Sequence, residues 1–177
     1  MSSRIFLYFI PSVGDQLNIE AFVDNLQAEG LEFDDHAFIS DIDFDGVPTC
    51  SSQKKLGSPI NVSLSALLGN GKQIDVVCSN ESILFTCGFG SPHRYAISSV
   101  STTLRGWNQL TDESRSIYLQ SFVKIAEKSN AERIIIVNDP ADNFYSNVLE
   151  VDGQWVLDNR LVDGSKYEIT ELWSKQI

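Results

Sequence analysis

Residues 4–30, RIFLYFIPSVGDQLNIEAFVDNLQAEG, place a strand and a helix one after the other near the beginning of the chain. The nearly continuous apolar run that opens this stretch predicts a strand buried on both faces. Asp15 or Asn18 can then cap a helix that continues to about Glu29, and Gly30 stands where helices often end in a left-handed residue. The helix repeats its apolar residues at the spacing of one buried face: Ile19, Phe22, Val23 and Leu26.

The rest of the chain alternates between strand-like and helix-like patterns. Strands are predicted where β-branched and aromatic residues run together or alternate, at residues 31–45, 74–79, 83–88, 95–104 and 133–138, followed by a hairpin of 144–151 and 154–159. Helices are predicted at residues 64–68, at 111–128, and after Ser165, which has capping-box spacing to Glu168. The polar segment 48–59 predicts an exposed loop, and the glycines of 69–71 and 88–90 predict turns. Strands in runs, separated by two principal helices, predict a single α+β domain over residues 1–177 with a mixed or mainly antiparallel sheet.

Length and composition favour a soluble chain with a core of its own. The 177 residues are 42% hydrophobic and include ten Phe and three Trp, enough to form a core without disulfide or metal support. The opening apolar run is too short to span a membrane and lacks a small-residue cleavage site, and the number of cysteines is odd. These features predict a cytoplasmic protein whose cysteines fill the core: Cys50, Cys78 and Cys87.

Negative charge is concentrated in the first third of the chain. The net charge is −11, and residues 15–45 hold ten Asp or Glu and no Lys or Arg. Binding to nucleic acid or to an anionic membrane requires clustered Lys and Arg, so we expect neither. The partner that this charge favours is a basic protein.

The string 41–46, DIDFDG, matches the first six positions of an EF-hand calcium loop. The match then fails, because Pro48 stands where an apolar residue is usual and Ser52 stands where a bidentate Glu is needed. We therefore expect no metal site. On a strand, the alternation places three acids on a single outer face, either as an ordinary hydrated edge or as a docking surface: Asp41, Asp43 and Asp45.

Residue types for catalysis or cofactor binding are sparse. The chain has two histidines, His36 and His93, and no Ser or Cys in a known nucleophile motif. Its glycine-rich strings lack the spacing of a phosphate-binding or dinucleotide-binding loop. We expect no enzymatic activity and no cofactor. The alternative is an enzyme with an unrecognised site, in which His36 or His93 would serve as acid or base.

In size, charge and the acidic run from Glu32 through Asp45, the chain resembles the immunity proteins of bacterial contact-dependent and other polymorphic toxin systems. The resemblance implies a cytoplasmic α+β inhibitor that neutralises a basic toxin by stoichiometric binding, with a nuclease as the toxin class that charge favours. Acids flanked by aromatic anchors would make the contact: Glu32, Phe33, Asp34, Asp35, Phe38, Asp41, Asp43, Phe44 and Asp45. The alternative is a general interaction or regulatory module with a non-toxic partner.

Overall fold

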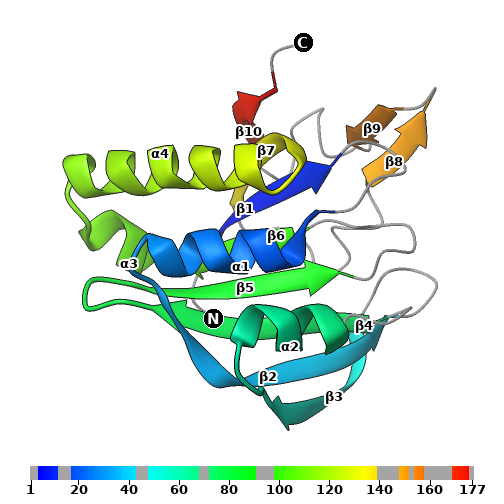
Figure 1. Ribbon diagram of the computed structural model, residues 1–177. Coiled ribbons are helices and arrows are strands. Elements are labelled where there is room, and N and C mark those ends of the chain that lie inside the picture. The colour runs from blue at the N-terminus through cyan, green and yellow to red at the C-terminus, as the bar shows by residue number, and fades with distance from the viewer. Residues whose placement is uncertain are drawn as a thin grey trace.

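A computed structural model describes residues 4–11, 17–42, 48–67, 72–90, 98–138, 148–151, 154–157 and 169–175 of the chain. Its centre is an eight-stranded sheet in which each strand runs antiparallel to its neighbours (Figure 1). The spatial order is β10 (Ile169–Ser174), β7 (Ala131–Asn138), β1 (Arg4–Pro11), β6 (Ser98–Thr103), β5 (Leu84–Gly90), β4 (Lys72–Ser79), β2 (Glu32–Ile42) and β3 (Pro48–Lys55). A hairpin of β8 (Val148–Val151) and β9 (Gln154–Leu157) forms a second, two-stranded sheet. The predicted α+β class is confirmed, and the sheet is antiparallel.

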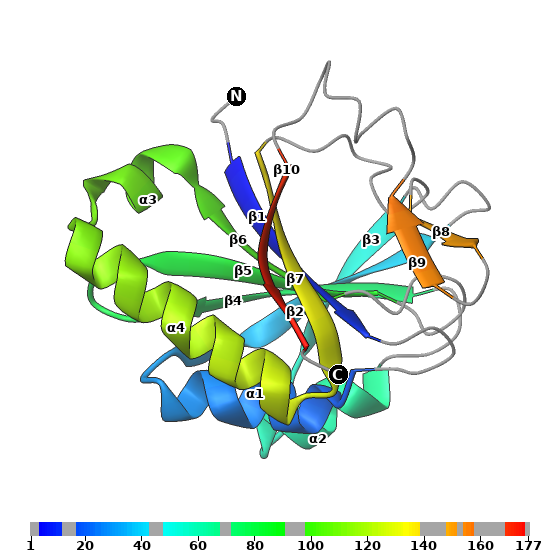
Figure 2. The ribbon, with the colours of Figure 1, turned by 90° about the horizontal axis from the view of Figure 1, so that it is seen from above.

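The helices gather on one face of the large sheet (Figures 1 and 2). α1 (Ile19–Ala28) packs against both α2 (Ile60–Leu67) and α4 (Asp112–Lys128), while the short α3 (Leu104–Gln109) follows β6 directly. Asn18 and Thr111 cap α1 and α4 by accepting a hydrogen bond from the backbone N–H three residues later, as their side chains predict. Gly30 has a φ of 89°, which lets the chain turn from α1 into β2. None of the helices in the described ranges is long and apolar enough to cross a membrane.

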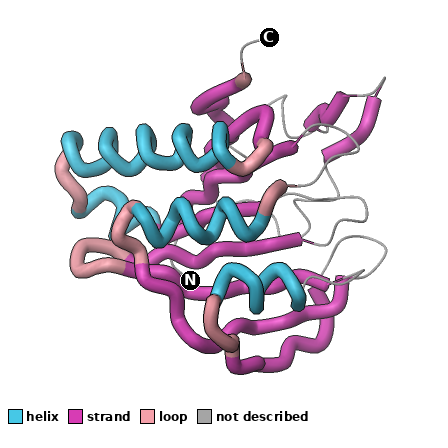
Figure 3. Tube along the Cα trace, in the orientation of Figure 1, coloured by secondary structure: helices cyan, strands magenta, loops and turns pink. Residues whose placement is uncertain are grey.

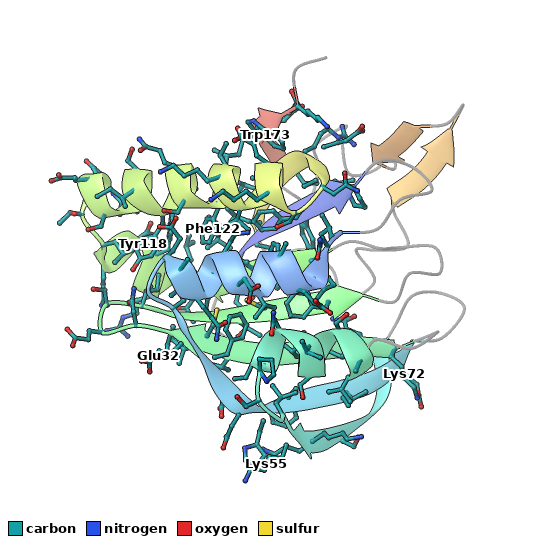
Figure 4. All side chains as sticks on the ribbon, in the orientation of Figure 1. Glu32, Lys55, Lys72, Tyr118, Phe122 and Trp173 are labelled. Atoms are coloured by element: carbon teal, nitrogen blue, oxygen red, sulfur yellow. The ribbon has the colours of Figure 1, made fainter. Side chains whose placement is uncertain are left out.

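The core lies between these helices and the sheet. Phe22 of α1 meets Phe9 of β1 and Phe89 of β5 edge to face, with ring centroids 4.9 and 5.7 Å apart. Figure 4 shows Tyr118 and Phe122 on the side of α4 that faces the sheet, where both rings contact Phe85. Two of the three cysteines fill this core as predicted, Cys78 and Cys87, which are fully buried.

Two predicted segments are wrong in kind, and both form edge strands (Figure 3). The segment 48–59, expected to be a loop, contains β3, which pairs with β2 through its backbone although its side chains are polar. An edge strand needs no apolar alternation when solvent covers one of its sides. The expected C-terminal helix is instead β10, because pairing with the apolar β7 satisfies its backbone and places Leu172 and Trp173 against the core.

Glycines at 88–90 were expected in turns, but they lie on β5. Gly88 is buried opposite Asp75 of β4, on the face of the sheet turned away from α1, α2 and α4. We call this the far face. It carries every second residue of each central strand, including the paired positions Phe38, Asp75, Gly88 and Ser99. Glycine stands in this strand because side chains from three neighbours crowd the space that a Cβ would occupy.

Candidate functional site

The predicted acidic run is interrupted by a bulge in β2. Phe33 pairs with Cys78 and Ala37 pairs with Val76, so three residues of β2 lie opposite a single residue of β4. Those three are Asp34, Asp35 and His36, which we call the acidic bulge. Extra residues in one strand increase its local twist and turn side chains out of the regular alternation. Both carboxylates of the acidic bulge are exposed to solvent.

Hydrogen bonds hold the acidic bulge in shape. His36 Nδ1 lies 2.7 Å from Asp35 Oδ1, and the backbone N–H of His36 donates to Asp34 Oδ1 at 3.4 Å. The backbone N–H of Leu56 donates to the carbonyl of Asp35 at 2.6 Å, which ties the bulge to the chain just after β3. The hydrogen bond from His36 is the main reason that the pKa of Asp35 is lowered, with smaller contributions that include Asp34 and Lys55. Asp35 is therefore anionic at neutral pH.

The other predicted contact residues are divided between two ends of β2. Glu32, labelled in Figure 4, is exposed where β2 begins. Together with Glu81 of the β4–β5 turn it lines an open depression of about 640 Å³. Asp41 is exposed near the opposite end of the strand and forms an ion pair with Lys72 of β4. Asp43, Phe44 and Asp45 lie outside the described residues. The structure thus brings Glu32 and the acidic bulge together and leaves Asp41 apart from them.

The two described aromatic anchors have opposite environments. Phe33 belongs to the hydrophobic core and is 9% exposed, so its ring is covered in this fold. Phe38 lies on the far face and is 50% exposed. Only Phe38 of this pair is available to a partner. Strand alternation explains the difference, because Phe33 and Phe38 are five residues apart and the bulge between them, which adds two residues, keeps their side chains on opposite faces of the sheet.

Positive charge also reaches this region from β3. Lys55 pairs with His36 and Lys54 with Ala37, so two exposed lysines lie beside the acidic bulge (Figure 4). The absence of Lys and Arg from residues 15–45 therefore overstates how negative the folded surface is. Sequence reasoning missed this because it expected the lysines in a loop instead of a paired strand.

The side chains of the acidic bulge are of the types that bind cations. The ligand-type atoms of Asp34, Asp35 and His36 lie within 4.8 Å of one another. All three side chains are at least partly open to water, and exposed acids of this kind commonly hold no ion. The EF-hand resemblance at 41–46 is not supported by its setting, because Asp41 and Ile42 are strand residues of β2 and not the end of a helix. His93 lies outside the described residues.

A second polar cluster, which sequence reasoning missed, lies on the far face beside Phe38. Gln73 and Asp75 of β4 converge with Ser99 of β6 over the bare Cα of Gly88. A Cβ at Gly88 would stand 2.8 Å from Ser99 Oγ, 3.2 Å from Asp75 Oδ1 and 3.8 Å from Gln73 Nε2. We call these four residues the polar notch. A charged residue within an otherwise apolar strand, Asp75 in IDVVC, was the available signal.

The chain is an antiparallel α+β domain. Its strand β2 carries the acidic bulge and the exposed Phe38, and the neighbouring β4 carries the part-buried Asp75. Comparison with known proteins found no matching family model, no matching curated protein and no matching solved structure.

Proposed function

We propose that this chain is an immunity protein that neutralises a basic toxin domain by binding it one to one through the surface around the acidic bulge. A nuclease is the toxin class that charge favours, because enzymes acting on polyanions carry basic surfaces. The observation that carries the proposal is the exposure of Glu32, Asp34 and Asp35 at one end of β2, in a chain of net charge −11.

The rigidity of this arrangement supports a role in binding. Repulsion among the carboxylates of a chain of net charge −11 lowers its stability as a whole, although His36 stabilises the anion of Asp35 itself. Hydrogen bonds fix Asp34 and Asp35 in the bulge instead of leaving them free to separate. A rigid anionic surface loses little conformational entropy when a cationic surface meets it. Its field also accelerates the encounter, by one to three orders of magnitude in strongly charged pairs (roughly 10–10³).

Phe38 adds the apolar component that a stable interface needs. Its ring is half exposed on the strand that carries the acidic bulge, two residues after His36. Aromatic side chains are common among the residues that dominate binding energy, particularly at the centre of an interface with charged groups around it. The proposed contact surface therefore consists of Glu32, the acidic bulge and Phe38, and it omits the buried Phe33.

The test compares three forms of the full-length chain. The bulge variant carries Glu32→Gln, Asp34→Asn and Asp35→Asn. The helix-control variant loses the same charge through exposed residues of α1 and α4: Glu20→Gln, Asp24→Asn and Glu127→Gln. Each form is used to capture partners from the native cell, and captured proteins are identified by mass spectrometry.

We expect the wild type and the helix-control variant to retain one basic protein at a one-to-one ratio, and the bulge variant to lose it. The captured protein is then expressed alone and with each form. Wild-type and helix-control chains should restore growth, and the bulge variant should not. A partner that is harmless when expressed alone would refute the immunity role, and equal rescue by all three forms would refute the proposed surface.

A further inference from the structure

The polar notch contains more hydrogen-bond acceptors than donors to satisfy them. Gln73 is 9% exposed, and its Oε1 atom has no hydrogen-bond partner within the part of the chain that the structure describes. Among the described residues, Asp75 receives a single side-chain hydrogen bond, from Gln73 Nε2 at a long 3.4 Å. An ionised carboxylate can accept about four hydrogen bonds and an amide oxygen about two. Buried polar groups are nearly always partnered, so the deficit at the part-buried Asp75 carboxylate indicates a missing donor.

Burial makes the deficit more unfavourable. Removal from water raises the pKa of Asp75, and the hydrogen bond from Gln73 only partly opposes this effect. The described residues of the far face offer little compensating charge nearby. Arg4 of β1 donates to Ser101 Oγ at 3.0 Å and lies near Thr86 Oγ1 at 3.5 Å, one step along the sheet from the notch. Lys55 of β3 lies opposite His36. Neither cation contacts Asp75.

The notch also has a wall that suits a flat cation. Phe38 of β2 is the direct cross-strand neighbour of Asp75 on the far face, and the residue is half exposed. On the other side of Asp75 stands Gly88, whose lack of a side chain lets Asp75 Oδ1 and Ser99 Oγ lie close above its Cα. An exposed ring beside a carboxylate is a setting in which a cation gains from both the ring face and the opposite charge.

We propose that the polar notch binds the guanidinium group of an arginine side chain on the basic partner. The planar group stacks on Phe38 and donates to the Asp75 carboxylate. A guanidinium fits better than an ammonium, because it offers five donors in a rigid fork and stacks on aromatic rings. The inference rests on the proposed function, which supplies the partner, and it names the group that enters next to the acidic bulge.

The first experiment needs no partner. The full-length chain, labelled with ¹⁵N, is titrated with the peptide acetyl-Gly-Gly-Arg-Gly-Gly-amide and with the same peptide containing citrulline or lysine. Citrulline keeps the shape of arginine and lacks its charge. The arginine peptide should shift the side-chain amide signals of Gln73 and the backbone amide of Gly88 in a saturable way. The lysine peptide should bind more weakly, and the citrulline peptide should leave these signals unchanged.

Two variants and two controls complete the titration. Asp75→Asn and Phe38→Leu should each weaken arginine-peptide binding, the first by at least about tenfold. The matched controls are Asp24→Asn, an exposed acid on α1, and Leu84→Ala, another exposed apolar residue of the far face. They should bind like the wild type. Asp75→Asn is isosteric and removes a part-buried charge, so thermal unfolding is expected to show an intact fold. Equal shifts with arginine and citrulline, or unchanged binding by Asp75→Asn, would overturn the proposal and assign the notch to the fold alone.

A second arm separates this inference from the proposed function. With the captured partner, the notch proposal predicts that Asp75→Asn increases the dissociation rate, whereas the bulge variant mainly reduces the association rate. If the notch binds the arginine peptide but the chain captures no toxin, the immunity role is refuted and the notch proposal stands. If a toxin complex forms and Asp75→Asn leaves its dissociation rate unchanged, the notch is refuted as a contact and the immunity role stands.

Discussion

Replacing Phe33 and Phe38 by alanine, one at a time, should have opposite effects on folding and binding. Both are phenylalanines of β2, five positions apart and separated by the acidic bulge. Phe33 is 9% exposed and packs in the core, whereas Phe38 is 50% exposed on the far face. The same chemical change therefore removes a core side chain in one variant and a surface side chain in the other.

The size of each effect follows from burial. Truncating a buried Phe costs about 3–5 kcal/mol, because the transfer free energy is lost and a cavity remains. Full burial of a Phe side chain is worth about 1.5–3 kcal/mol, so the half-covered Phe38 should cost roughly 1 kcal/mol, with solvent filling the space. In a chain of this length each kcal/mol lowers Tm by about 2–4 °C. We expect a loss of roughly 6–20 °C for Phe33→Ala and roughly 2–4 °C for Phe38→Ala.

Urea unfolding followed by circular dichroism, with thermal unfolding of the same samples, measures both losses. Partner capture by each folded variant provides the second reading. Phe38→Ala should keep its fold and lose affinity, and Phe33→Ala should lose stability while its remaining folded fraction still binds. Equal destabilisation of the two variants would show that Phe38 is packed as tightly as Phe33, and the proposed contact surface would then be wrong.

Three further changes probe the sheet itself. Burial raises the pKa of Asp75 in the folded chain, so the free energy of unfolding is highest below the unfolded pKa of about 4 and falls as pH rises through the folded pKa. Asp75→Asn should therefore stabilise the chain at neutral pH and flatten this fall, measured by urea unfolding from pH 3 to 8. Gly88→Ala should cost about 1–3 kcal/mol by crowding Ser99, and Ser99→Ala in the same chain should recover part of that loss. Cys78 and Cys87 are fully buried with their Sγ atoms 3.3 Å apart, and burial together with the contact from Cys78 raises the pKa of Cys87. Iodoacetamide should therefore leave both thiols unmodified until urea unfolds the chain, as measured by mass spectrometry.

Sequence patterns predicted the parts of the fold whose local and tertiary preferences agree. The strand at 4–11 and the helix after Asn18 combine an apolar pattern with a capping residue and a terminal glycine, so their positions were predictable. The strands β3 and β10 were not predicted, and the reason is the same for both. Each is an edge strand that forms because it pairs with a neighbouring strand, and a local stretch of sequence contains no information about that neighbour.

The candidate site was predictable only in part. The exposed acids Glu32, Asp34 and Asp35 follow from composition and spacing. Which of Phe33 and Phe38 faces the core does not follow, because alternation predicts only that they lie on opposite faces, and the packing of the sheet decides which face is buried. Asp75 was the least visible residue of all. Its strand reads as apolar, and its importance emerges only when Gly88 is paired with it across the sheet.

In the proposed function, the carboxylates around the acidic bulge guide a basic partner onto the chain. Stopped-flow association with the purified partner, repeated from about 20 to 500 mM NaCl, tests this most directly, since salt screens steering between exposed charges. We expect the bulge variant to associate at least about tenfold more slowly at low salt and to show a shallow salt dependence, with the helix-control variant matching the wild type. Identical rates and salt slopes for all three forms would contradict the claim.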